Sequence, residues 1–132
     1  MSRLDNGRTH PLLAPRQIRD VLLILLGVAG LLSKRWLAES LGELIFSYLG
    51  NVTVSFAVYF WVSLAARQRL GRGALVLLAL LIVDTFELTD GFGIMSNVYD
   101  RFDLLANALG VALAWCVDIG SSRISRLSRR GA

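Results

Sequence analysis

The stretch "NVYDRFDLLANALGVALAW", from Asn97 to Trp115, combines acidic side chains with a strongly apolar run. Two aspartates, Asp100 and Asp103, precede a series of leucines and alanines that is interrupted only by Asn107. Asp103 and Asn107 are four residues apart, so a helix places them on the same face, one turn apart. The stretch therefore predicts an apolar helix that carries polar groups along one face.

The rest of the chain is similarly apolar. It has 132 residues, of which 55% are hydrophobic, and a mean hydropathy of +0.57. This length suits one domain. Long segments are apolar around their whole circumference instead of alternating, which indicates that lipid surrounds them. We expect an all-α, polytopic membrane protein with a bundle of four transmembrane helices.

The apolar runs set the expected organisation. A membrane domain over residues 20–120 contains spans at about 20–33, 42–66, 74–92 and 101–119, between basic tails at 1–19 and 121–132. The first span has a short apolar core, Val21 to Leu32, so crossing requires flanking side chains to snorkel. A cleaved signal peptide is the rival interpretation of this run, although no clear A-x-A site follows it.

The distribution of Lys and Arg predicts the orientation. With four spans, eleven of these residues lie in the two tails and the second loop, and three lie in the first and third loops. Because positive residues accumulate on the cytoplasmic side, both termini are expected in the cytoplasm of a bacterial inner membrane. The basic residues cluster at the ends of spans, so the charge of +4 does not indicate nucleic-acid binding.

This orientation brings seven acidic or amide side chains to the outer leaflet. They are Glu43, Asp84, Glu87, Asp90, Asp100, Asp103 and Asn107. A carboxylate that faces lipid costs about 2.5–3.5 kcal/mol on insertion scales, so these groups should face the bundle interior. If the third helix ends near residues 91–93, Glu87 lies about 6–9 Å deep and Asn107 about 10 Å deep, so the two could meet. We predict a ligand-binding cluster formed by Glu87, Asp103, Asn107, Asp100, Asp84 and Glu43.

Several kinds of chemistry compete for this cluster. Interhelical hydrogen bonding alone would explain Asn107, and helix capping would explain Asp103. Oxygen ligands suit a hard cation, but no loop of the EF-hand kind is present, so no metal or cofactor is predicted. The sole histidine, His10, lies in the N-terminal tail, and Cys116 has no partner at metal-ligand spacing. No hydrolase or zinc motif appears, and only carboxylate acid–base catalysis stays open.

The segment "FELTDGFGIMSNVYDRFDLLANALGVALAW" resembles the VanZ-like family of small bacterial membrane proteins. The family pattern has a glutamate near a helix end, followed by Asp-x-x-Asp-Leu-x-x-Asn-x-x-Gly at the entry to the last helix. The matching positions are Glu87, Asp100, Asp103, Asn107 and Gly110. Two positions depart from the pattern: Asp90 stands where glutamine is common, and Asn97 stands near the place of an arginine.

The resemblance implies a role at the cell envelope connected with glycopeptide (teicoplanin) sensitivity, without implying a reaction. We expect the outward cluster to bind a polar lipid head group, a cell-wall precursor or an antibiotic. One alternative is a proton- or cation-coupled transporter component, which would require a homo-oligomer because four helices form a narrow pathway. The other is a non-catalytic membrane scaffold whose polar residues only join helices.

Overall fold

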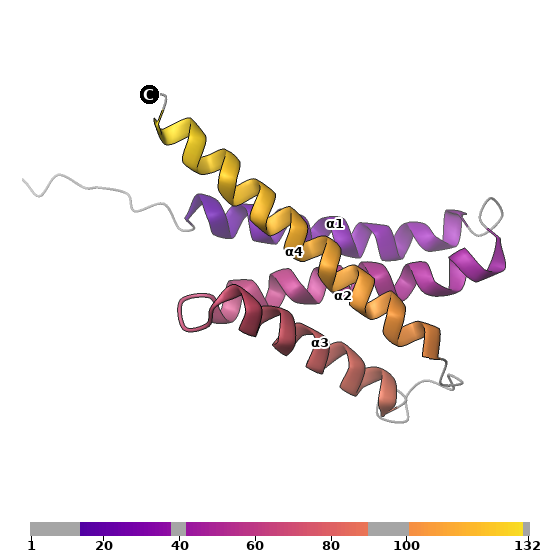
Figure 1. Cartoon of the computed structure of the whole chain (residues 1–132). Coiled ribbons are helices and arrows are strands. Elements are labelled where there is room, and N and C mark those ends of the chain that lie inside the picture. Colours follow the sequence, from indigo (N-terminus) through magenta and orange to yellow (C-terminus); the bar gives the residue numbers. More distant parts are fainter. Residues whose placement is uncertain (1–13, 38–41, 90–100, 131–132) are drawn as a thin grey trace, which may run out of the picture.

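The computed structural model describes residues 14–37, 42–89 and 101–130, which form four α-helices (Figure 1). These are α1 (Pro15–Leu37), α2 (Glu43–Ala66), α3 (Arg72–Leu88) and α4 (Arg101–Arg130). Successive helices run in opposite directions, so α1 begins and α4 ends at one end of the bundle, here called the terminal end. The predicted all-α, four-helix bundle is confirmed.

Among the described residues, two helical segments are long and apolar enough to cross a membrane, Tyr48–Ala66 and Arg101–Ile124. Helix α3 has 17 residues, a length of about 25 Å at 1.5 Å per residue. The helices also extend beyond the expected spans. Helix α1 begins at Pro15, a favourable first helical residue, inside the segment predicted as a tail. Helix α4 continues through the basic segment to Arg130.

Helix α2 lies at the centre of the bundle and packs against the other three helices. Glycines of α1 make a close approach to α2 feasible. A Cβ atom added at Gly27 would lie 2.8 Å from the Ala57 Cβ, and one at Gly30 would lie 2.9 Å from the Thr53 Cγ2. Both distances are too short for a side chain, so small residues set the α1–α2 spacing.

Helices α2 and α4 approach each other closely at Gly110. A Cβ atom added there would lie 2.3 Å from the Val52 carbonyl oxygen and 2.9 Å from the Ser55 Cβ. Helix α4 crosses α2 diagonally (Figure 1). The glycine of the quoted stretch is therefore required by the crossing, because any side chain would push the two backbones apart.

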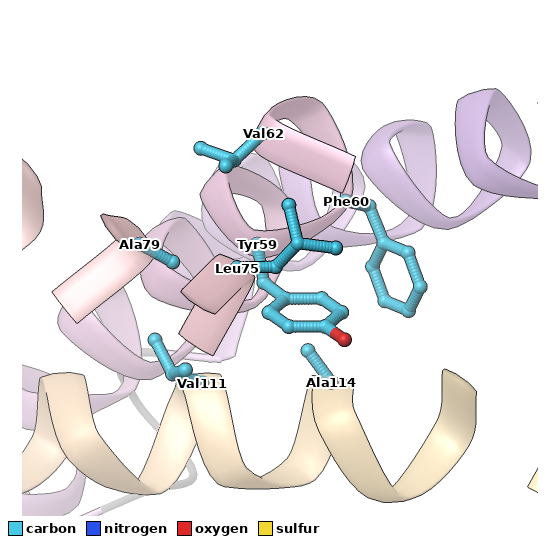
Figure 2. Close-up of a cluster of buried hydrophobic side chains, with 7 residues drawn as sticks. All are labelled: Tyr59, Phe60, Val62, Leu75, Ala79, Val111 and Ala114. Carbon is cyan, nitrogen blue, oxygen red and sulfur yellow. The ribbon is translucent and has the colours of Figure 1, made fainter. Parts of the chain in front are cut away.

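The apolar core lies between α2, α3 and α4 (Figure 2). Its centre is the Tyr59 ring, which lies over Val111 and Ala114 of α4 with Leu75 of α3 on its other side. The rings of Tyr59 and Phe60 meet edge to face, with centroids 5.2 Å apart. The remaining members of the cluster are Val62 and Ala79. Small residues on α4 thus make room for large ones on α2.

The outer surface of the bundle is strongly apolar. Large hydrophobic side chains are exposed at helical spacing on α1, α3 and α4, and Trp61 of α2 is 59% exposed. These residues include Leu22, Leu25, Leu26 and Leu32 on α1, Leu77 and Leu81 on α3, and Leu105, Leu109 and Leu113 on α4. Contiguous apolar surface of this kind marks contact with a membrane or a partner rather than with water.

The contact at Gly110 gives a first testable prediction. Gly110→Ala should lower the free energy of unfolding by about 1–3 kcal/mol, because the added methyl group overlaps backbone that cannot move aside. Gly120→Ala, on the same helix, meets nothing within 4 Å. It should leave stability unchanged or raise it by up to about 1 kcal/mol. Thermal unfolding in detergent, followed by circular dichroism, measures both; equal melting temperatures would contradict the close crossing.

Candidate functional site

One face of α4 carries polar groups near its start and in its middle, with apolar residues between them. Asp103, Asn107, Val111, Ala114 and Asp118 recur at intervals of three or four residues, and all five are buried. This spacing places them on a single helix face. That face packs against α2 and α3, so the polar side chains of α4 point into the bundle.

The first polar group lies at the end of the bundle opposite the terminal end. Asn51 Nδ2 donates to Asp103 Oδ1 over 2.7 Å. Ser55 Oγ donates to Asn107 Oδ1 over 2.7 Å, and Asn107 Nδ2 donates to Asp84 Oδ1 over 3.3 Å. These five residues, from α2, α3 and α4, are called the amide–carboxylate cluster.

Three predicted site residues, Asp84, Asp103 and Asn107, are therefore members of this cluster. The α3 partner of Asn107 is Asp84 instead of Glu87, which lies one turn further along. The reason is helix length: α3 ends at Leu88, so Glu87 lies only about 1.5 Å from its end and Asp84 about 6 Å. Asn107 lies about 9 Å beyond the start of α4, a depth that Asp84 matches better.

The remaining predicted site residues are placed differently. Glu87 is half-buried near the end of α3 and takes part in an interaction of its own. Asp100 and Asp90 lie outside the described residues, and so does the side chain of Glu43. Asn51 and Ser55 belong to the cluster although they were not predicted for it. Their spacing of four residues within an apolar helix was the available signal.

The cluster is closed at its centre and open at its edge. Asn107 is 3% exposed and uses both its carbonyl oxygen and its amide nitrogen within the bundle. It therefore joins helices and has little capacity left for a ligand. Asp84 and Glu87 are half-buried, so the α3 side of this region is partly accessible from outside the bundle. This edge suits a cationic or hydrogen-bond-donating group, because its described groups are acceptors.

A second polar group, not predicted from the sequence, lies at the terminal end. At its centre is Asp118, whose side chain is fully buried. Its Oδ1 accepts from Arg19 Nη2 over 3.0 Å, and its Oδ2 accepts from Arg72 Nε over 3.1 Å. Arg67 Nη2 and the Tyr59 hydroxyl also donate to Oδ2, the latter over 3.3 Å. One carboxylate thus contacts side chains from all of the other three helices.

Further hydrogen bonds surround this carboxylate. Arg19 also donates to the buried Asp20 and, over 2.7 Å, to Ser121 Oγ. Ser63 Oγ donates to Asp20 and accepts from Arg67 Nη1 over 2.6 Å. Arg72 Nη2 donates to Ser122 Oγ over 2.8 Å. We call this group the Asp118 cluster: Arg19, Asp20, Tyr59, Ser63, Arg67, Arg72, Asp118, Ser121 and Ser122.

The Asp118 cluster has an excess of positive charge. Three guanidinium groups, of Arg19, Arg67 and Arg72, face the two carboxylates of Asp20 and Asp118. Burial lowers the pKa of the Arg67 guanidinium from its usual value, and the Asp118 carboxylate opposes that shift. The two carboxylates are buried, and buried charges persist only when they are paired and hydrogen-bonded. Every buried side-chain nitrogen or oxygen in the described residues has such a partner.

The sequence pattern does not by itself predict this cluster, because arginines at the ends of apolar segments are also explained by membrane orientation. The signal was a lone carboxylate in "WCVDIG", at the end of an apolar run whose neighbouring segment ends all carry arginine. No group of three His, Cys, Asp or Glu side chains within the described part of the chain has metal-binding geometry.

A shallow apolar groove of about 280 Å³ lies between α1 and α2. Its lining consists of Leu26, Gly27, Gly30, Val52, Thr53 and Phe56. The Thr53 hydroxyl donates to the backbone of its own helix, at Leu49 and Gly50. The groove therefore suits an aliphatic chain better than a polar group.

Comparisons with protein-family models, with curated proteins and with solved structures find no match to this chain. The resemblance to the VanZ-like family consequently depends on the five sequence positions given above.

The Asp118 cluster gives a second prediction. Asp118→Asn should lower the free energy of unfolding by about 3–5 kcal/mol, because it leaves partly buried guanidinium groups without a counter-charge. Denaturant titration in detergent, followed by helical circular dichroism, provides the measurement. Cys116→Ser, at an exposed position on the same helix, is the control and should change stability by less than about 0.5 kcal/mol. A loss no larger than that of the control would show that the ion pairs contribute nothing net.

The amide–carboxylate cluster gives a third prediction, tested by a double-mutant cycle. Ser55→Ala and Asn107→Ala should each destabilise the fold, because each leaves a buried partner without its hydrogen bond. The double variant should be less destabilised than the sum of the two, with a coupling energy of about 0.5–1.5 kcal/mol. If the destabilisation of the double variant equals the sum of the two single variants, the 2.7 Å hydrogen bond between Ser55 and Asn107 contributes nothing to stability.

Proposed function

We propose that the chain is a polytopic protein of the bacterial inner membrane, with both termini in the cytoplasm. The observation that carries this proposal is the distribution of polarity in the bundle. Leucines cover the outside of α1, α3 and α4, whereas Asp20, Asp103, Asn107 and Asp118 are buried. Lipid permits this arrangement, since apolar side chains can face it while ionisable groups must pair inside.

The Lys and Arg distribution supports the orientation. The terminal end carries the basic segments, including the arginines of the Asp118 cluster, and would lie at the cytoplasmic surface. The amide–carboxylate cluster would then open outward, where the VanZ-like resemblance also places its acidic and amide residues. Such a protein belongs to the cell envelope, and its exposure to the outside provides a route to altered glycopeptide sensitivity.

The ligand class that fits the outward edge is a polar lipid head group or cell-wall precursor that carries an ammonium group. Asp84, Glu87 and Asp103 supply carboxylates there, and Asp84 and Glu87 are not fully buried. An ammonium group donates three hydrogen bonds and neutralises part of this charge. Asn107 holds the three helices in place beneath the edge instead of contacting the ligand.

One specific observation favours a second candidate, a non-catalytic membrane scaffold. Both polar atoms of the Asn107 side chain are bonded within the bundle. If Asp84 and Asp103 only accept hydrogen bonds from Asn107 and Asn51, the whole cluster serves to stabilise the packing of the helices. The two candidates differ in what Glu87 does, since Glu87 is not a member of the amide–carboxylate cluster.

A topology measurement tests the membrane proposal. Full-length protein should remain in the membrane fraction after carbonate extraction, since spanning segments cannot be washed off. A C-terminal green fluorescent protein fusion should be fluorescent, and a C-terminal alkaline phosphatase fusion should be inactive, because the C-terminus is cytoplasmic. Release by carbonate would contradict the spanning bundle, and an active phosphatase fusion would contradict the orientation.

Substitution of Glu87 tests the ligand. In nanodiscs of mixed phosphatidylethanolamine and phosphatidylglycerol, Glu87→Gln should retain about tenfold less phosphatidylethanolamine, because one charge-assisted contact is lost. Native mass spectrometry measures the retained lipid, and Glu87→Asp, which keeps the charge, is the matched control. Unchanged lipid retention and unchanged glycopeptide sensitivity in a variant that still inserts would leave the scaffold as the better description.

A further inference from the structure

The Asp118 cluster contains more hydrogen-bond donors than its carboxylates can use. Asp118 Oδ2 accepts from Tyr59, Arg67 and Arg72, and its Oδ1 accepts from Arg19. A carboxylate has about four lone-pair sites, so Asp118 is saturated. The arginines are not saturated, because each guanidinium group carries five N–H donors.

The unused donors belong mainly to Arg72 and Arg67. Within the described part of the chain, Arg72 bonds through Nε and Nη2, so both hydrogens of its Nη1 are unused. Arg67 bonds through Nη1 and Nη2, which leaves its Nε hydrogen. The Arg72 side chain is 37% exposed and that of Arg67 is 12% exposed. These donors are thus held in fixed geometry at the edge of the bundle.

A fourth arginine increases the positive charge. Arg16 is exposed one turn before Arg19 on α1, and its positive charge is among the causes that lower the pKa of Arg67, after burial. It makes no hydrogen bond within residues 14–37, 42–89 and 101–130, so it contributes charge without being used internally. With Arg16 included, the terminal end has four positive side chains and the two carboxylates of Asp20 and Asp118. The terminal end therefore lacks negative charge.

We infer that the terminal end binds a phosphate group through Arg72, Arg67 and Arg16, with Asp118 holding the first two in position. Phosphate oxygens accept charge-assisted hydrogen bonds from guanidinium groups, often two from one fork. A bound phosphate would supply the missing negative charge, while Asp118 keeps the guanidinium planes from rotating away.

Two sources supply this chemistry, an anionic phospholipid of the cytoplasmic leaflet and a free phosphate anion. Basic pockets between helices on the cytoplasmic side bind anionic head groups. The lipid source rests on the membrane placement proposed above, whereas the phosphate site itself does not. The site also differs from the outward carboxylate edge in position and in sign, so the two can be tested separately.

The test uses purified full-length protein in detergent and two soluble probes, dioctanoyl phosphatidylglycerol and inorganic phosphate. Phosphatidylglycerol should bind, and Arg72→Gln should weaken binding about tenfold, the expected loss for charge-assisted contacts to phosphate. Arg69→Gln removes the same charge from an exposed turn three residues away and should change the affinity by less than about twofold. Dioctanoyl phosphatidylcholine, whose head group has no net charge, should bind more weakly than phosphatidylglycerol.

The two probes separate the sources. Arg72-dependent binding of inorganic phosphate alone assigns the site to a free anion, and this result stands even if the protein proves not to span a membrane. Arg72-dependent binding of phosphatidylglycerol with no binding of phosphate assigns it to a lipid. If Arg72→Gln does not fold, Arg16→Gln replaces it, with an expected loss of about threefold. Equal losses in Arg69→Gln and Arg72→Gln, or no loss in the folded variant, would overturn the site.

Discussion

At its terminal end, the bundle depends on the ion pairs and hydrogen bonds made by the buried carboxylate of Asp118. A lone ionised carboxylate inside a bundle is unstable unless opposite charges and hydrogen-bond donors surround it. Helix α1 supplies Arg19, α2 supplies the Tyr59 hydroxyl, and α3 supplies Arg72. Arg67, directly after the end of α2, is the fourth donor. Segments separated by 46 to 99 residues therefore meet at one group. Their relative positions are set by charge as much as by packing.

Tyr59 connects the apolar core to the Asp118 cluster. The Tyr59 ring occupies the centre of the core, between Leu75 and the small residues of α4, while its hydroxyl reaches Asp118 (Figure 2). The core therefore cannot loosen around Tyr59 without disturbing the ion pairs. At the other end, the amides of Asn51 and Asn107 bridge helices through hydrogen bonds to Asp103 and Asp84. The bundle is thus held by charge at one end and by amides at the other.

Much of the fold follows from features that a sequence displays locally. Apolar runs separated by basic turns predict four helices, and the spacing of Asp103 and Asn107 predicts a shared inward face. The pairing across helices was only partly predictable, because it depends on where a helix ends. Placing the end of α3 a few residues too far made Glu87 the expected partner of Asn107, where the structure has Asp84. The Asp118 cluster was not anticipated, since the convergence of distant arginines is a tertiary property.

The close contact at Gly110 would act as a pivot if α4 tilted relative to α2. Backbone contact fixes a pivot between the two polar clusters, with Asn107 about 4.5 Å to one side along the helix and Asp118 about 12 Å to the other. Rocking of α4 about this pivot would move the two ends in opposite directions, and the Asp118 end nearly three times as far. A small displacement at the amide–carboxylate cluster would thus be accompanied by a larger one at the arginines of the Asp118 cluster, and a displacement at the arginines by a smaller one at the amide–carboxylate cluster. The position of Gly110 along α4 therefore makes the displacements at the two clusters unequal.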